Sequence, residues 1–89
     1  MKFINVGFSN IIAAERVVSV SPPDSAPMKR LISDAKTDGL LVDVSCGRKT
    51  KSVIITDCRL VLLSAISPDR LKSRLNGEDD SAADEEDEE

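Results

Sequence analysis

The segment from residue 40 to residue 56 reads LLVDVSCGRKTKSVIIT, so two apolar runs flank a glycine and three cationic side chains. Val, Ile and Leu dominate both runs, which is typical of β-strands. Gly47 supplies the backbone freedom that a tight connection requires. The segment therefore predicts two strands joined by a basic hairpin tip, with Arg48 at the turn and Lys49 and Lys51 after it. A solvated turn that owes its charges to solubility alone is the alternative interpretation.

Apolar runs on either side of this segment predict further strands. Their ends coincide with glycine, proline or short polar turns, as expected for a small sheet. The expected additional strands lie at residues 2–6, 11–20 and 60–63, with a kink or bulge at residues 13–15 and a tight turn at residues 57–59.

Two helices are predicted from capping residues and apolar periodicity. Ser25 can cap a helix that has Pro27 in its first turn and ends before Gly39. Ser67 can cap a shorter helix over residues 68–76. The expected fold class is therefore α+β: a small, mainly antiparallel sheet with one amphipathic helix after the first strands and a short C-terminal helix.

The runs at residues 53–56 and 60–63 do not alternate between apolar and polar side chains, which indicates that both faces of their sheet are covered. The apolar stripe of the first helix can cover one face. The second cover must then come from the C-terminal segment or from another subunit. For a chain of 89 residues, whose capacity for a self-sufficient core is limited, this predicts a homo-oligomer.

Charge is strongly segregated along the chain. All 12 Lys and Arg precede Gly77 together with seven acids, which gives the body 12 minus 7, or +5, whereas residues 78–89 hold nine acids and no base. We expect a single α+β domain over residues 1–76 and a disordered acidic tail over residues 77–89. A basic body favours a polyanionic partner.

Several function classes find no support in the sequence. Histidine is absent, and Cys46 and Cys58 lack the spacing of a metal site, so we expect no metal, no cofactor and free thiols. No phosphate-binding glycine motif and no catalytic triad can be assembled, so an enzyme with a small-molecule substrate is not expected. The chain shows no membrane-spanning run, which favours a cytoplasmic protein without a membrane partner. Phe3 and Phe8 are the only aromatic residues, which disfavours recognition of single strands by base stacking.

Five motifs resemble the RemA family of small bacterial regulators, which is named for control of extracellular matrix genes. The resemblance covers residue 2 to about residue 76. It implies a DNA-binding transcription activator of matrix and biofilm genes, with a fold related to LytTR-type DNA-binding domains and protomers that close into a ring. The motifs are NVGF at residues 5–8, RVV at 16–18, SAPMKR at 25–30, GRKTK at 47–51 and VIITD at 53–57.

The resemblance ties Arg16 and the pair Arg48 and Lys49 to DNA binding. Lys49 stands where arginine is common in the family, and lysine contacts phosphate as a point charge. We expect Lys51 to join them in neutralising phosphates, and we expect Lys29 and Arg30 to widen the binding surface. Arg16 remains open between a phosphate contact, a groove contact, a residue of an edge strand and a subunit interface.

The leading hypothesis is therefore a sequence-tolerant, nucleoid-associated binder of double-stranded DNA that presents many copies of the basic turn on an oligomer. A structural or adaptor ring that holds protein partners is the second hypothesis. The first hypothesis predicts that affinity for duplex DNA falls steeply as the salt concentration rises, and the second does not.

Overall fold

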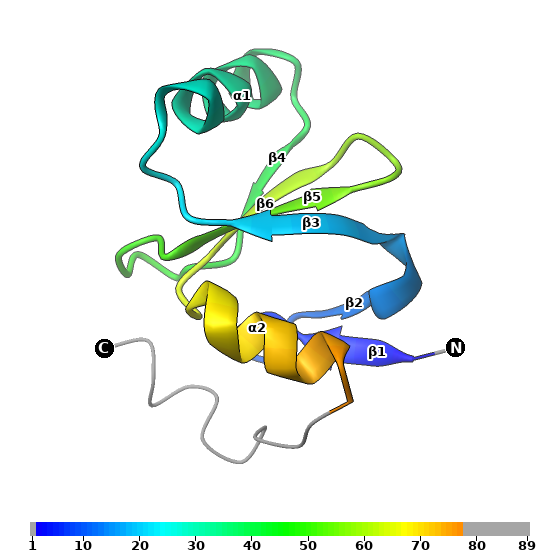
Figure 1. The fold of residues 1–89 in the computed structure, drawn as a ribbon. Helices are drawn as coiled ribbons and strands as arrows, with labels where there is room; N and C mark the ends of the chain where they lie inside the picture. Colours follow the sequence, from blue (N-terminus) through cyan, green and yellow to red (C-terminus); the bar gives the residue numbers. More distant parts are fainter. Residues whose placement is uncertain (1, 78–89) are drawn as a thin grey trace.

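The computed structural model describes residues 2–77, so the predicted acidic tail beyond Gly77 lies outside the described residues. The described part confirms an α+β fold with two helices, a two-stranded sheet and a four-stranded sheet (Figure 1). The relation to LytTR-type domains stays a prediction. In chain order the elements are β1 (Phe3–Asn5), β2 (Ile11–Ala13), the 3-10 helix η1 (Ala14–Arg16), β3 (Val17–Ser21), α1 (Ala26–Thr37), β4 (Leu41–Asp43), β5 (Ser52–Thr56), β6 (Val61–Ser64) and α2 (Pro68–Leu75).

The four-stranded sheet has the order β3-β5-β6-β4, so the predicted hairpin between β4 and β5 is wrong. Strand β6 lies between them, parallel to β4 and antiparallel to β5. The basic connection passes over the end of β6, because the Val44 and Lys51 amides donate to the carbonyls of Leu63 and Ser64 at 2.9 and 2.8 Å. The largely buried β6 takes an inner position, whereas β4 ends in the exposed Asp43 and takes the edge. A central strand needs cover on both faces, and an edge strand does not.

The two faces of this sheet are covered by different elements (Figure 1). Helix α1 packs on one face through a cluster that includes Ala35, Val53 and Val61. Helix α2 and the β1–β2 hairpin cover the other face through a cluster that includes Ile54 and Leu71. The second cover therefore comes from within the chain, and an oligomer would have to use other surfaces.

Both predicted helix starts are confirmed by their caps. The Ser25 hydroxyl accepts from the Met28 amide at 3.2 Å, and the Ser67 hydroxyl accepts from the Arg70 amide at 3.4 Å. Gly39, with φ +74°, follows the end of α1 as expected. The irregularity predicted at residues 13–15 is η1, which carries the chain from the two-stranded sheet to the four-stranded one. Neither helix in residues 2–77 is long and apolar enough to span a bilayer.

A buried serine joins the two sheets. The Ser64 hydroxyl donates to the Val6 carbonyl at 2.7 Å and accepts from the Ile66 amide at 3.1 Å, and Ser64 is fully buried. Replacing Ser64 with alanine leaves two buried backbone groups without this partner, so we expect the free energy of unfolding to fall by about 1–3 kcal/mol. Urea denaturation measures the change. The exposed Ser33→Ala on α1 is the matched control, and equal stability of the two variants would contradict the expectation.

Candidate nucleic-acid interface

The basic loop, residues 45–51, begins with a turn that is held by backbone and side-chain hydrogen bonds. The Arg48 amide donates to the Ser45 carbonyl at 3.0 Å, and the two residues between them, Cys46 and Gly47, both have positive φ. The Asp43 carboxylate accepts from the Ser45 amide at 2.9 Å and from its hydroxyl at 2.6 Å. The expected role of Gly47 is confirmed, and the buried Ser45 anchors a turn whose tip faces solvent.

The tip of the β1–β2 hairpin packs against this loop. The guanidinium carbon of Arg48 lies 5.8 Å from the centroid of the Phe8 ring, a distance typical of cation–π contacts. Phe8 sits in a turn closed by the Asn10 amide, which donates to the Gly7 carbonyl at 3.0 Å. The Asn10 side chain donates to the same carbonyl at 2.9 Å. The Phe8 ring therefore restricts the positions that the Arg48 guanidinium can take, although the two residues lie 40 positions apart in the sequence.

The loop presents fixed charge to solvent. Arg48 and Lys49 are exposed, and Lys51 is half-buried beside the end of β6. An exposed cation held by an aromatic ring loses little conformational freedom when it meets an anion. The structure thus groups three of the predicted site residues at one end of the four-stranded sheet.

Arg16 is not part of this group. It precedes Val17, which pairs with Thr56 at the far end of β5, whereas Lys51 precedes the start of β5 (Figure 1). Six residue steps of extended chain from Lys51 to Asp57 correspond to roughly 20 Å. The sequence left open whether Arg16 joins the basic loop, and within a protomer the fold puts the two at opposite ends of the sheet.

Arg16 forms an ion pair that the sequence analysis missed. Its Nη1 lies 3.3 Å from each oxygen of the Asp57 carboxylate. The Asp57 amide also donates to the Arg16 carbonyl at 2.9 Å. The side chains remain 63% and 45% exposed, so a ligand can approach the pair. Arg16 lies just before β3, an outer strand of the four-stranded sheet, and its guanidinium is exposed.

The turn that carries Asp57 is held by Thr56. The Thr56 hydroxyl donates to the Leu60 carbonyl at 2.9 Å and lies 3.3 Å from the Cys58 sulfur. This contact with the Thr56 side chain, helped by the backbone of Leu60, lowers the pKa of the Cys58 thiol. Cys46 and Cys58 are both free, and both are exposed.

Some of the remaining cationic side chains are exposed on the surface, and one is buried and stabilises the fold. Lys29 and Arg30 are exposed on α1, and α1 lies across the four-stranded sheet from the β1–β2 hairpin (Figure 1). Arg30 borders a surface hollow that it shares with Arg59. Arg74 is buried and donates to the Asn5 carbonyl at 2.8 Å, which ties α2 to β1.

No group of metal-binding side chains occurs among the described residues. The basic loop offers the cationic side chains of Arg48, Lys49 and Lys51 and the exposed thiol of Cys46.

The similarity to known proteins extends over nearly all of the residues that the structure describes. A family sequence model described as "RemA-like: Extracellular matrix regulatory protein A-like" matches residues 3–75. A Clostridium beijerinckii protein is 49% identical over 88 residues, which cover 99% of this chain and 98% of the relative. A Geobacillus thermodenitrificans protein is 50% identical over 80 residues, covering 90% and 92%. A Halothermothrix orenii protein is 51% identical over 79 residues, covering 89% and 94%. All three are provisionally named regulatory proteins, and the names state no ligand.

Proposed function

Because this chain belongs to the family of extracellular matrix regulatory protein A-like proteins, we propose that it is a double-stranded DNA-binding transcriptional regulator. We further propose that it acts as a ring-shaped homo-oligomer and activates genes of the extracellular matrix and biofilm. The observation that supports DNA binding most directly is the basic loop, in which Arg48 is held over Phe8 at 5.8 Å. We propose a regulatory role and no catalytic one.

The basic loop suits phosphate contacts. Arg48 offers a planar group of N–H donors to a phosphate, and Lys49 and Lys51 offer ammonium groups. Contacts of this kind bind DNA with little dependence on sequence. Three cations on one protomer bind weakly at physiological salt, so many copies on one oligomer are needed for useful affinity.

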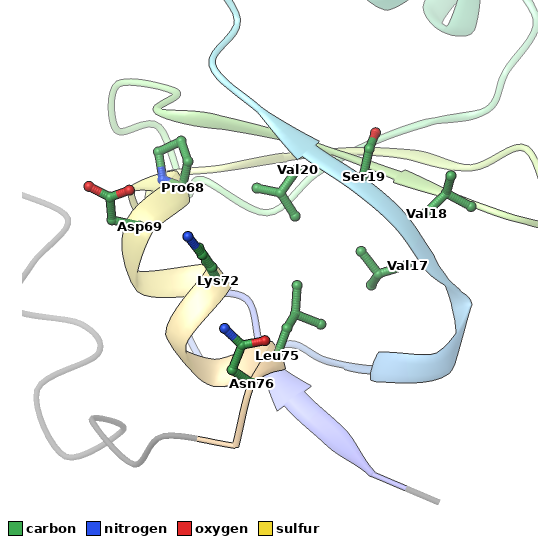
Figure 2. A pocket seen from close by; sticks show the side chains of 9 residues that line it. All are labelled: Val17, Val18, Ser19, Val20, Pro68, Asp69, Lys72, Leu75 and Asn76. Carbon is green, nitrogen blue, oxygen red and sulfur yellow. The ribbon is translucent and has the colours of Figure 1, made fainter.

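Two opposite edges of the four-stranded sheet support self-association. At the β3 edge, a groove of about 430 Å³ lies between β3 and α2, and Val18 is 66% exposed. Figure 2 shows Val17 and Val20 on β3 at one side of this groove and Leu75 on α2 at the other. At the β4 edge, a cleft of about 390 Å³ lies between β2 and the sheet, with Ile11 62% exposed at its side.

The two edges are made of different strands, so a contact between one edge and the other joins two different surfaces. Strands β3 and β4 are the outer strands of the sheet and have a strand neighbour on one side only within residues 2–77. A contact between the β3 edge of one copy and the β4 edge of the next is heterologous, and repetition of such a contact gives a closed ring when the rotation permits. This arrangement covers the exposed apolar side chains of both edges and places one basic loop on every subunit.

The salt dependence of duplex binding tests the proposed function. The logarithm of the binding constant should fall linearly with the logarithm of salt concentration, by about 0.9 for every phosphate neutralised. Three contacts in one engaged copy give a slope of about −2.7, and several copies give a steeper one. Fluorescence anisotropy with an unselected duplex measures the slope, and a single strand of equal length is the control. An adaptor that binds only protein partners would show neither the affinity nor the slope.

A further inference from the structure

We propose that the acidic tail, whose charges lie in residues 78–89, binds the basic loop and competes there with DNA phosphate. The tail then acts as a built-in inhibitor, so that DNA is held only where several copies of the loop engage it together. This inference rests on the proposed function, because it takes the phosphates of duplex DNA as the competing ligand.

The acidic tail reverses the sign of the net charge. The body carries +5 and residues 78–89 carry −9, and 5 minus 9 gives the −4 of the whole chain. DNA repels a molecule of net negative charge, so attraction begins only where DNA faces the body and the tail does not intervene. Any DNA that reaches the basic loop therefore competes with nine carboxylates that are tethered to the same chain.

The tail leaves the described body beside a cationic side chain. The Lys2 ammonium donates to the Leu75 carbonyl at the end of α2, at 3.3 Å. Its Nζ lies 3.4 Å from the position that a Cβ on Gly77 would take. The acidic residues 78–89 therefore follow a point next to the start of β1, the strand that leads to the hairpin tip at Phe8.

The length of the tail matches the distance to the basic loop. Six residue steps along the chain from Lys2 to Phe8 correspond to roughly 20 Å, and Phe8 contacts Arg48. Twelve residues follow Gly77, and an extended chain of that length spans at most about 40 Å. The last six residues, 84–89, are all acidic, and in an extended chain they begin about 24 Å from Gly77. The densest negative charge can therefore reach the basic loop of the same protomer.

The basic loop is better suited to a run of carboxylates than the other exposed cations are. It has cations at three of the four positions 48–51 and no acid within residues 45–51. Arg16, in contrast, is already paired with Asp57 at 3.3 Å. The hollow beside Arg30 is lined by two aspartates as well. An acidic segment meets local repulsion at both of these places and less of it at the loop.

The first test compares duplex binding by wild type and by an amide-tail variant, a full-length chain with Glu→Gln and Asp→Asn at all nine acidic positions of residues 78–89. Three exposed ion pairs in one loop contribute roughly three- to 150-fold in affinity. The amide-tail variant should therefore bind an unselected duplex more tightly by such a factor per engaged copy at about 10 mM salt, where the Debye length is about 30 Å. The gain should shrink towards 150 mM salt, where that length is about 8 Å. A variant with residues 78–89 in shuffled order keeps the charge and should bind like wild type.

The second test contains no DNA and uses the exposed thiol of Cys46 in the basic loop. In a Cys58→Ser background, Cys46 reacts with the dianionic disulfide dithiobis(nitrobenzoate) or with the neutral disulfide dithiodipyridine. A tail seated on the loop repels the dianion, so the ratio of the anionic to the neutral rate should rise several-fold in the amide-tail variant at low salt. The control thiol is Ser33→Cys on α1, an exposed position, in a chain with Cys46→Ser and Cys58→Ser. Its ratio should change much less.

The inference is overturned if the ratios at Cys46 and at Ser33→Cys rise equally, because the tail would then act through net charge and not by binding the loop. It is also overturned if wild type and the amide-tail variant bind duplex DNA with equal affinity at low salt, an outcome that leaves the proposed function standing. If neither protein binds any duplex, the proposed function itself is removed and the competition with it. Circular dichroism of each variant checks that the fold is retained.

Discussion

Duplex DNA binding should weaken about tenfold or more for each engaged copy when Arg48 is replaced with alanine. A charge-assisted contact contributes about 1.5–3 kcal/mol, which corresponds to roughly ten- to 150-fold in affinity. Because every subunit of an oligomer carries the same substitution, the losses multiply over the copies that touch the DNA. The salt slope should become shallower by about 0.9 for every phosphate that is no longer neutralised. Anisotropy titrations of wild type and variant over a range of salt concentrations measure both quantities.

Lys36→Ala is the control for this experiment, because it removes one positive charge from an exposed position on α1, away from the basic loop. It should reduce affinity only slightly. Phe8→Leu should give a loss between those of the two alanine variants, since it removes the ring beneath Arg48 and keeps every charge. Equal losses in Arg48→Ala and Lys36→Ala would show that net charge alone, and not the basic loop, determines binding.

Single aspartate substitutions at either sheet edge should reduce the proposed oligomer to monomers. Val18→Asp places a carboxylate at the β3 edge, and Ile11→Asp places one at the β4 edge. Both side chains are largely exposed in the protomer, so the fold should be retained, as circular dichroism would confirm. Burying an unpaired carboxylate in an apolar contact costs several kcal/mol. Loss of avidity should then lower duplex affinity by orders of magnitude. Light scattering measures the mass.

A mixture of the two variants tests the heterologous arrangement specifically. Each variant retains one intact edge, and these edges are complementary, so the mixture should form dimers and nothing larger. Ser33→Asp on α1 is the control for the added charge and should keep the wild-type mass. A mixture that stays monomeric would exclude the pairing of the β3 edge with the β4 edge. A monomeric wild type at micromolar concentration would exclude the oligomer altogether.

The local elements of this protein follow from the sequence alone. Ser25 and Ser67 predict both helix starts because a cap acts within one helical turn. The apolar runs predict strands near their observed positions, and Gly47 predicts the turn that exposes Arg48. The cationic residues of the basic loop adjoin one another in the chain, so their grouping needs no tertiary information. The family resemblance is also a property of the sequence, and the family match over residues 3–75 confirms it.

The way in which these elements combine depends on the tertiary structure. Strand order results from competition among apolar strands for the covered centre of the sheet, and β6 takes that place between two strands that the chain presents in succession. Contacts such as Arg48 with Phe8 and Arg16 with Asp57 join residues 40 and 41 positions apart. Periodicity and capping act over a few residues and carry no information about such pairs. The separation of Arg16 from the basic loop follows from the direction of β5, which the positions of the cationic residues along the chain do not reveal.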